Sequence, residues 1–437
     1  MPIAKMPIAK MPIAKMPIAK MRVAKMPVAK MPIAKMPVAK SPSRRFVLIG
    51  AGGLALTGGS PFQARAQSPA LRLGVLTPLT GAGSFDGPRM LKAMQSVADE
   101  VNAAGGVLGR KIELVVEDDE TNPEAAVRAA HKLIEVDKVP VIMGTWASAV
   151  TTAVAPVCWE SKTFLTTVSG ADSITQLPHQ GYLIRTQPNT QLQGAKHCEF
   201  IAALGMKRVY MLSIQAPFAQ PMLDRSKEIL AKNKSELVGG LIYEKDKTTY
   251  RSEIDQALRT NPDLIYLNGY APDVTIILRD LYRAGFSGPR FAQSYAVTTK
   301  VLESLPAEVT EGIYTVQPSS DVDSPAYELA AKRLGEKDPD SYETQATDWI
   351  SLVVLTIAKA KEATGTALRD NVRKIKQASG VKVYSAVEGL KQLADGKEIN
   401  YGGASGPCEF NAIGDVTDCK FRYQLVHGGK SAFLKIV

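Results

Sequence analysis

The chain has 437 residues, which is enough for two domains of ordinary size with additional segments. Its formal net charge of +10 would suggest a polyanionic partner, but residues 1–66 hold twelve basic side chains and no acidic one. The remaining residues carry 41 basic and 43 acidic side chains, so we expect no nucleic acid among its partners.

Metal, cofactor and membrane signals are missing from the sequence. The four cysteines form no CxxC pair, and the four histidines are scattered without the spacing of metal ligands, so no metal or cofactor is expected. The longest apolar run, residues 46–56, is too short to cross a membrane.

Residues 1–40 are eight pentapeptides of the form MPIAK, with MRVAK and MPVAK as variants. Proline at nearly every fifth position excludes a helix, and a period of five matches neither helix nor strand. Because every unit begins with Met, we interpret the repeat as a disordered segment or a duplication around a start codon. Translation then begins at Met36 or an earlier unit; a functional repeat is the alternative.

Residues 41–66 have the pattern of a signal peptide. Arg44 and Arg45 precede a short apolar, glycine-rich segment, and Ala64-Arg65-Ala66 fits the small-x-small cleavage rule. The paired arginines resemble a twin-arginine signal, although Val47 stands where Phe is preferred, and a Sec signal is the alternative. We therefore predict export to the periplasm and cleavage after Ala66.

The mature chain alternates strands and helices in two series. In the first, strands are predicted at 71–76, 111–117, 141–143, 164–168 and 183–188, with helices at 88–104, 124–136 and 148–160. In the second, strands are predicted at 208–214, 237–243, 264–268 and 290–293, with helices at 192–204, 219–232, 250–260 and 273–284. A strand at 312–316 is expected to return to the first lobe, followed by helices at 325–334 and 343–362.

This pattern predicts an α/β protein of two Rossmann-like lobes with parallel sheets. Lobe I is expected to comprise residues 67–188 with 313–417, and lobe II residues 189–312 with 418–437. More than one crossing of the chain would join the lobes into a hinged clamp with a cleft between them.

Two loops of the first lobe, at 144–148 and 169–173, follow parallel strands at their carboxyl ends, where open α/β sheets bind ligands. Both offer small residues, hydroxyls and free backbone N–H groups close to a helix start. The sequence therefore predicts a site for a small anion such as a carboxylate.

The tail from residue 401 is predicted to form a β-hairpin with its turn at 411–415. Cys408 and Cys419 would lie on neighbouring arms, and in an exported chain a disulfide between them is the favoured hypothesis. Cys158 and Cys198 lie on helical faces and are expected to be buried free thiols.

Several segments resemble the type I solute-binding proteins of ABC importers, in the leucine/isoleucine/valine and amide-binding branch. They are LRLGVLTPLTGAGS at 71–84, NAAGGVLGRKIELVVEDDETNPEAA at 102–126, GTWASAVTTAVAP at 144–156, SGADSIT at 169–175, NPDLIYLNGYAPD at 261–273 and RDLYRAGFSGPRF at 279–291. The resemblance extends over residues 70–437, and the order and spacing of the segments make it specific.

In the first lobe, the resemblance implies that Ser148 meets the ligand carboxylate; a plain helix N-cap is the alternative. Gly170 and Ala171 would offer backbone N–H groups. Asp172 either accepts from a ligand ammonium or caps the next helix. Phe85 matches an aromatic lid position and Trp146 lies in the first ligand loop, with plain packing as the alternative for both.

In the second lobe, Phe218, Tyr270 and Tyr295 match positions that face the cleft. Amino-acid binders carry a carboxylate for the α-ammonium group where this chain has Tyr295. This departure favours an aromatic or aliphatic acid, or an amide, over an amino acid. Asp172 and Asp273 are the alternative partners for an ammonium group.

The resemblance implies a monomeric periplasmic receptor that delivers a small solute to a membrane-embedded ABC permease. A sensory receptor of the same fold, which signals ligand occupancy to a partner, is one alternative. An α/β hydrolytic enzyme is another, but the sequence lacks a GxSxG elbow, a GxGxxG or Walker loop and a metal cluster. We therefore expect that the protein is not an enzyme.

Overall fold

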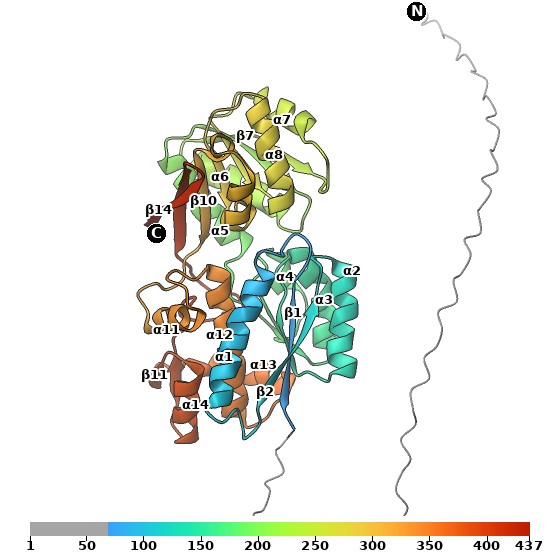
Figure 1. Cartoon of the computed structure of the whole chain (residues 1–437), viewed down its shortest axis with the longest axis vertical. Coiled ribbons are helices and arrows are strands. Elements are labelled where there is room, and N and C mark those ends of the chain that lie inside the picture. The colour runs from blue at the N-terminus through green and yellow to red at the C-terminus, as the bar shows by residue number, and fades with distance from the viewer. Residues whose placement is uncertain (1–68) are drawn as a thin grey trace, which may run out of the picture. The chain divides into compact units, whose positions relative to one another are not determined.

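The computed structural model describes residues 69–437, which form two α/β lobes (Figure 1). The MPIAK repeat, the predicted signal peptide and the predicted cleavage site after Ala66 lie outside the described residues. No helix among residues 69–437 is long and apolar enough to cross a membrane.

The first lobe is built on a five-stranded parallel sheet with the order β2-β1-β3-β4-β5. This is a doubly wound order, in which the strand sequence reverses between β1 and β3. Its strands are β1 (Leu71–Thr77), β2 (Ile112–Asp118), β3 (Val141–Gly144), β4 (Phe164–Thr167) and β5 (Leu183–Arg185). All residues of β3, β4 and β5 are buried, as expected for a sheet covered on both faces.

Helices cover this sheet, and they come from both ends of the chain. Helix α1 packs beside α12, although the two are far apart in sequence, and α2 packs on α3 (Figure 1). The helices are α1 (Gly87–Ala103), α2 (Pro123–His131), which continues into a π-helical turn at Lys132–Val136, α3 (Ser148–Glu160), α4 (Ser173–Gln176), α11 (Pro325–Leu334), α12 (Ser341–Ala360), α13 (Gly365–Asn371) with a 3₁₀ turn at Val372–Ile375, and α14 (Ala386–Ala394). A small parallel pair, β11 (Val381–Val383) and β12 (Ile399–Tyr401), lies next to α14.

The second lobe repeats the topology of the first. Its parallel strands have the order β7-β6-β8-β9-β10, and an antiparallel hairpin of β13 and β14 extends the sheet beyond β10 (Figure 1). The strands are β6 (Arg208–Ile214), β7 (Glu236–Tyr243), β8 (Leu264–Asn268), β9 (Arg290–Gln293), β10 (Ile313–Pro318), β13 (Phe421–His427) and β14 (Lys430–Ile436).

Four helices of the second lobe, α5 to α8, lie where the sequence predicts helices, whereas α9, α10 and a 3₁₀ turn were not predicted. These elements are α5 (Thr190–Ala203), α6 (Ala219–Lys232), α7 (Arg251–Leu258), α8 (Ala271–Arg283), a 3₁₀ turn at Ser294–Ala296, α9 (Thr299–Ser304) and α10 (Ala307–Thr310). Helix α6 and strands β6, β8 and β9 have the predicted bounds.

The structure places the strand predicted at 312–316 in the second lobe instead of the first. Strand β10 pairs in parallel with β9, from Ile313 opposite Arg290 to Val316 opposite Gln293, and antiparallel with β13. The chain crosses between the lobes at 186–189, at 319–324 and within 402–420. The second crossing therefore begins after β10, and lobe II contains residues 313–318.

The tail differs from the predicted hairpin. Only Phe410 and Val416 form a β-bridge around the expected turn, and the long hairpin is formed by β13 and β14. Cys408 and Cys419 are free thiols, so the predicted disulfide is absent. Cys408 and Cys419 both lie outside the bridged pair Phe410 and Val416, so they are not opposite each other on paired strands as the prediction requires. Cys158 and Cys198 are buried free thiols, as predicted.

Candidate functional site: a cavity between the two lobes

A cavity of about 390 Å³, part of it open to solvent, is lined by residues of both lobes. The lining residues are Trp146, Ser148, Val168, Gly170, Gln187, Thr190, Gln193, Phe218, Met222, Tyr270, Gln293, Tyr295 and Tyr342. Six of the predicted site residues are among them: Trp146, Ser148, Gly170, Phe218, Tyr270 and Tyr295.

The first ligand loop makes a sharp turn between β3 and α3. Gly144 has a φ of 128°, and a Cβ atom there would lie 2.2 Å from the carbonyl oxygen of Leu76, so only glycine fits. Thr145 follows with a φ of 61°, which is unusual for a β-branched residue. The turn places Trp146 and the start of α3, at Ser148, against the cavity.

A cluster of buried hydroxyl groups connects the first ligand loop to the second. The Thr151 hydroxyl lies within hydrogen-bond distance of the hydroxyls of Thr145, Thr167 and Ser169. Thr167 donates to the Thr145 carbonyl at 2.9 Å, and Ser169 donates to the Trp146 carbonyl at 3.0 Å. These contacts hold the strained Thr145 and fix the two loops relative to each other.

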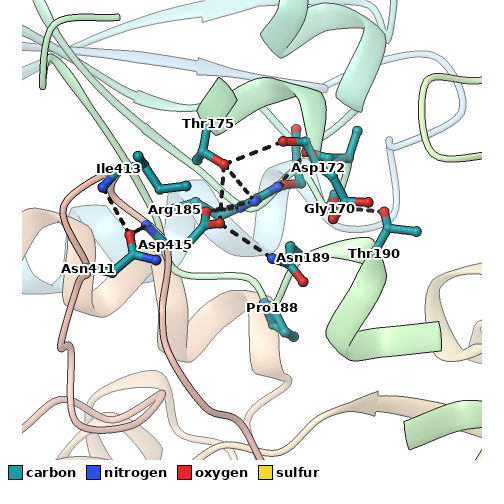
Figure 2. Close-up of polar contacts among 12 residues, drawn as sticks. Gly170, Asp172, Thr175, Arg185, Pro188, Asn189, Thr190, Asn411, Ile413 and Asp415 are labelled. Atoms are coloured by element: carbon teal, nitrogen blue, oxygen red, sulfur yellow. Dashed lines mark hydrogen bonds and ion pairs between the residues drawn. The ribbon is translucent and has the colours of Figure 1, made fainter. Parts of the chain in front are cut away.

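A buried ion pair supports the second ligand loop from the side of the hinge (Figure 2). Arg185 is fully buried and donates to the carbonyl oxygens of Ala171 at 2.6 Å and Ser169 at 3.2 Å. Its guanidinium is paired with Asp415, with 2.8 Å between Arg185 Nε and Asp415 Oδ1. Asn189, in the first crossing, donates weakly to the same carboxylate at 3.5 Å. The network therefore links the hinge to the backbone that presents Gly170.

Two predicted residues of this loop lie outside the cavity. Ala171 is fully buried, and its N–H donates to Ser148 Oγ at 3.3 Å, so it is not free for a ligand. Asp172 starts α4 without capping it and instead accepts from the backbone N–H of Gln191 in the second lobe at 3.2 Å. Asp172 therefore does not cap α4, and its contact with a ligand ammonium group stays a prediction.

Aromatic rings from both lobes form one wall of the cavity. The ring centroids of Trp146 and Tyr270 are 5.0 Å apart, and those of Trp146 and Tyr295 are 5.5 Å apart, so these rings touch across the two lobes. Phe218 meets Tyr270 edge-on, and Tyr342 meets Trp146. Burial raises the pKa of Tyr270, Tyr295 and Tyr342 well above the usual range, so all three remain hydroxyl donors.

Several donors of the cavity are unused by the described part of the chain. The indole N–H of Trp146 is buried without a partner there. The hydroxyls of Tyr270, Tyr295 and Tyr342 likewise make no hydrogen bond to residues 69–437. Neutral donors beside aromatic faces suit a small anionic or polar molecule with an apolar body.

Within residues 69–437, no charged side chain lines this cavity. Asp273, a predicted alternative partner for an ammonium group, lies inside the second lobe. There its carboxylate accepts from the Tyr250 hydroxyl and from the backbone N–H of Asp246. Phe85 lines a neighbouring cavity instead, with the guanidinium of Arg89 5.3 Å from its ring centroid.

Seven lining residues were missed by the sequence predictions: Val168, Gln187, Thr190, Gln193, Met222, Gln293 and Tyr342. Gln187 and Thr190 belong to the first crossing and the start of α5, and Tyr342 lies in the first turn of α12. The only signal for them was their position next to predicted crossings or strand ends. No group of three or more metal-ligating side chains is present in the described part of the chain.

Comparison with known proteins agrees with this geometry. A family model described as "Periplasmic binding protein" matches residues 70–398. An "Amino acid binding protein" of Pseudomonas aeruginosa is 27% identical over 235 residues, which cover 53% of this chain and 62% of that relative. The aligned region thus spans less than two thirds of the length of that relative.

Two solved structures show the same fold. A leucine binding protein, LivK, from Thermotoga maritima has a TM-score of 0.72 and 22% identity, covering 84% of this chain and 99% of that chain. A solute binding protein of an ABC transporter from R. palustris, in complex with benzoate, has a TM-score of 0.67 and 21% identity, covering 84% and 96%.

Proposed function

The chain belongs to the periplasmic binding protein family, and from this premise we propose that it is the extracytoplasmic substrate-binding protein of an ABC importer. It captures a small carboxylate-bearing solute between two closing lobes and presents it to a membrane-embedded permease. We propose further that it acts as a monomer and without catalysis. Size-exclusion chromatography with light scattering tests the monomer, and turnover of a bound solute would contradict the second statement.

One observation carries this proposal: the cavity joins hydroxyl and N–H donors of one lobe to aromatic rings of the other. Ser148 stands at the start of the 13-residue helix α3, where backbone N–H groups and the helix dipole favour an anion. The rings of Phe218, Tyr270 and Tyr295 would cover the apolar body of the solute. Contacts with both lobes exist only when the lobes are closed, so the ligand favours closure.

The absence of a carboxylate from the lining, within the described residues, favours an aromatic or aliphatic acid or an amide over an α-amino acid. An α-ammonium group next to the Ser148 loop would lose its hydration without gaining a counter-charge. The benzoate complex of the R. palustris protein supports an aromatic acid, although the leucine binding protein has the same fold.

A thermal-shift screen of amino acids, small aromatic and aliphatic acids and amides tests the proposal. A ligand at 100 times its dissociation constant stabilises the folded protein by about 2.7 kcal/mol, because it binds only that form. Titration calorimetry of Ser148→Ala with the best ligand should then show a loss of about 1.5–3 kcal/mol of affinity, since a hydrogen bond to a charged group disappears.

The matched control is Ser161→Ala, an exposed serine at the other end of the same helix, whose affinity should not change. Unchanged affinity in Ser148→Ala would place the carboxylate elsewhere. If no compound of the three classes stabilises the protein, the proposed function is wrong.

For export, we propose the twin-arginine route with cleavage after Ala66, because Arg44 and Arg45 precede a short apolar segment. The intact mass of the secreted protein should correspond to a chain that starts at Gln67. A mature protein that still carries MPIAK units would contradict this.

A further inference from the structure

A second cavity lies beside the first and is also lined by both lobes. It has about 770 Å³, part of it open to solvent, and Tyr295 lines both cavities. The first lobe contributes Phe85, Asp86, Arg89 and Asp340, and the second contributes hydroxyl groups that include Thr315. We call this space the acidic compartment.

Asp86 is the unusual residue of the acidic compartment. It is only 4% exposed, yet its carboxylate makes no hydrogen bond and no ion pair within residues 69–437. It precedes α1, where an aspartate would normally cap the helix, but its backbone is already helical, at φ −92° and ψ −36°. Pro88 also offers no N–H for it to accept. Helix capping therefore does not explain this buried carboxylate.

Neighbouring charges do not explain it either. Arg89, three residues away, points its guanidinium at Glu343, with 2.7 Å between Nη2 and Oε2, and at Glu336, at 3.6 Å. Asp340 accepts from the backbone N–H of Tyr342 at the start of α12. The carboxylate of Asp86 is thus the acidic group left without a partner in this compartment.

Two further polar atoms of the lining are also unpartnered. The hydroxyl of Thr315, on β10, and Nε of Arg422, on β13, are buried and make no hydrogen bond within the described chain. A buried polar group without a partner is costly, so these groups on one cavity favour a polar occupant. Arg422 already has a counter-charge in Asp338, with 2.6 Å between Nη2 and Oδ2, whereas Asp86 has none. The ionised form of Asp86 only accepts hydrogen bonds, so it favours an occupant that donates them and carries positive charge.

We propose that the acidic compartment binds a cationic nitrogen of the solute, with the carboxylate of Asp86 as its counter-charge. This rests on the proposed function, because the carboxylate of the same solute lies at the Ser148 loop. Tyr295 lines both cavities, so the two charged ends lie on either side of its ring. The solute class is therefore an acid whose amine is several bonds away from its carboxylate, in contrast to an α-amino acid.

The pH dependence of binding follows from the buried position of Asp86. Burial, and then the negative charge of Asp340, raise the pKa of the Asp86 carboxyl well above its usual range. Other charged or titratable groups that face it are Arg89, Glu343, Tyr295 and Tyr342. An amine has to displace the proton, so its affinity should fall as the pH is lowered, and binding should release protons.

Three probes test the proposal by titration calorimetry: 4-(aminomethyl)benzoate, 4-methylbenzoate and benzylamine. The wild-type protein should bind 4-(aminomethyl)benzoate at least tenfold more tightly than the methyl analogue. Asp86→Asn, which keeps the shape and removes the charge, should abolish this preference. Asp99→Asn, an exposed aspartate of the same helix, should keep it. Thermal unfolding confirms that each variant folds.

If Asp86→Asn does not fold, titrations of the wild-type protein at several pH values test the inference without the variant. Its affinity for 4-(aminomethyl)benzoate, but not for 4-methylbenzoate, should fall with falling pH, and buffers of different ionisation enthalpy should report proton release. Tight binding of 4-methylbenzoate with no gain from the amine would overturn the inference and leave the proposed function intact. Binding of benzylamine through Asp86 but of neither acid would support the inference and contradict the carboxylate site. Failure of all three probes would overturn the inference, and the thermal-shift screen of the wider set of solutes would then decide the proposed function separately.

Discussion

The two lobes have the same strand order, but their corresponding loops contribute different groups to the cavities between them. The loops of the first lobe that follow β1, β3 and β4 supply a carboxylate, hydroxyls and backbone N–H groups, at Asp86, Ser148 and Gly170. The corresponding loops of the second lobe, after β6, β8 and β9, supply the rings of Phe218, Tyr270 and Tyr295. Topology thus determines which loops meet at the cleft, and side chains determine what each lobe does there.

The lobes also stabilise these loops in different ways. In the first lobe, a buried ion pair (Figure 2) and a hydroxyl cluster hold the loop backbone. In the second lobe, rings pack against one another and against Trp146 of the first lobe. Directional hydrogen bonds fix the position of a polar donor, whereas ring packing tolerates small movements. We therefore expect the first lobe to define the docking site and the second to close over it.

Among the tests of this comparison, Asp415→Ala has the largest expected effect. It leaves Arg185 buried without a counter-charge, which should lower the free energy of unfolding by about 3–5 kcal/mol. Denaturant unfolding measures the loss. The control, Asp370→Ala, breaks the exposed pair with Arg369 and should cost less than about 1 kcal/mol. Similar small losses in both variants would show that the ion pair does not hold the first-lobe loop.

A second test uses Asp119, which follows β2 and has one buried carboxylate oxygen without a partner among the described residues. Burial raises the pKa of Asp119 to about 7. The folded protein therefore keeps a proton that the unfolded chain loses near pH 4, so this group lowers stability as the pH rises from about 4 to 7. Between pH 4 and pH 8, Asp119 should lower the free energy of unfolding of the wild-type protein by about 2–4 kcal/mol. Asp119→Asn should not show this decrease, which urea unfolding at several pH values measures.

The neighbouring Asp118 provides the control with opposite sign. Its burial raises the pKa, but hydrogen bonds from Thr80 and from backbone N–H groups outweigh this and lower the pKa overall. Asp118 therefore contributes stability that is present above the unfolded pKa and is lost as the pH falls, and Asp118→Asn should remove that contribution. The same pH response in both variants would contradict the assignment of Asp119.

The smallest expected effect comes from a double-mutant cycle of Trp146→Leu and Tyr270→Leu. Their rings lie 5.0 Å apart across the lobes, so the coupling energy should be about 0.5–1.5 kcal/mol. A bound ligand should change this coupling. The stacked pair Phe200 and Tyr423, 3.9 Å apart inside the second lobe, should keep its coupling with or without ligand. If the ligand changed the coupling energy of both pairs equally, or of neither, closure by the second-lobe rings would be contradicted.

Local pattern predicted most of the α/β units, because helix and strand periods are written in neighbouring residues. Helix α3 and strands β6, β8 and β9 have the predicted bounds. The strands β11 and β12 were not predicted, because each is three residues long and too short to show a strand period. The assignment of β10 to the first lobe was wrong. Hydrogen bonds to β9 and β13 place this strand in the second lobe, and the residues of the strand do not indicate these partners.

The sequence by itself determined that two α/β lobes carry ligand loops at the carboxyl ends of their strands, and it identified six residues of the cavity. Only the tertiary structure decided how the remaining polar groups are used. Packing directed the Ala171 N–H to Ser148, left Cys408 and Cys419 as free thiols, and left Asp86 without a partner. The physical reason is that hydrogen-bond satisfaction depends on groups brought together from distant parts of the chain, whereas secondary structure depends mainly on adjacent residues.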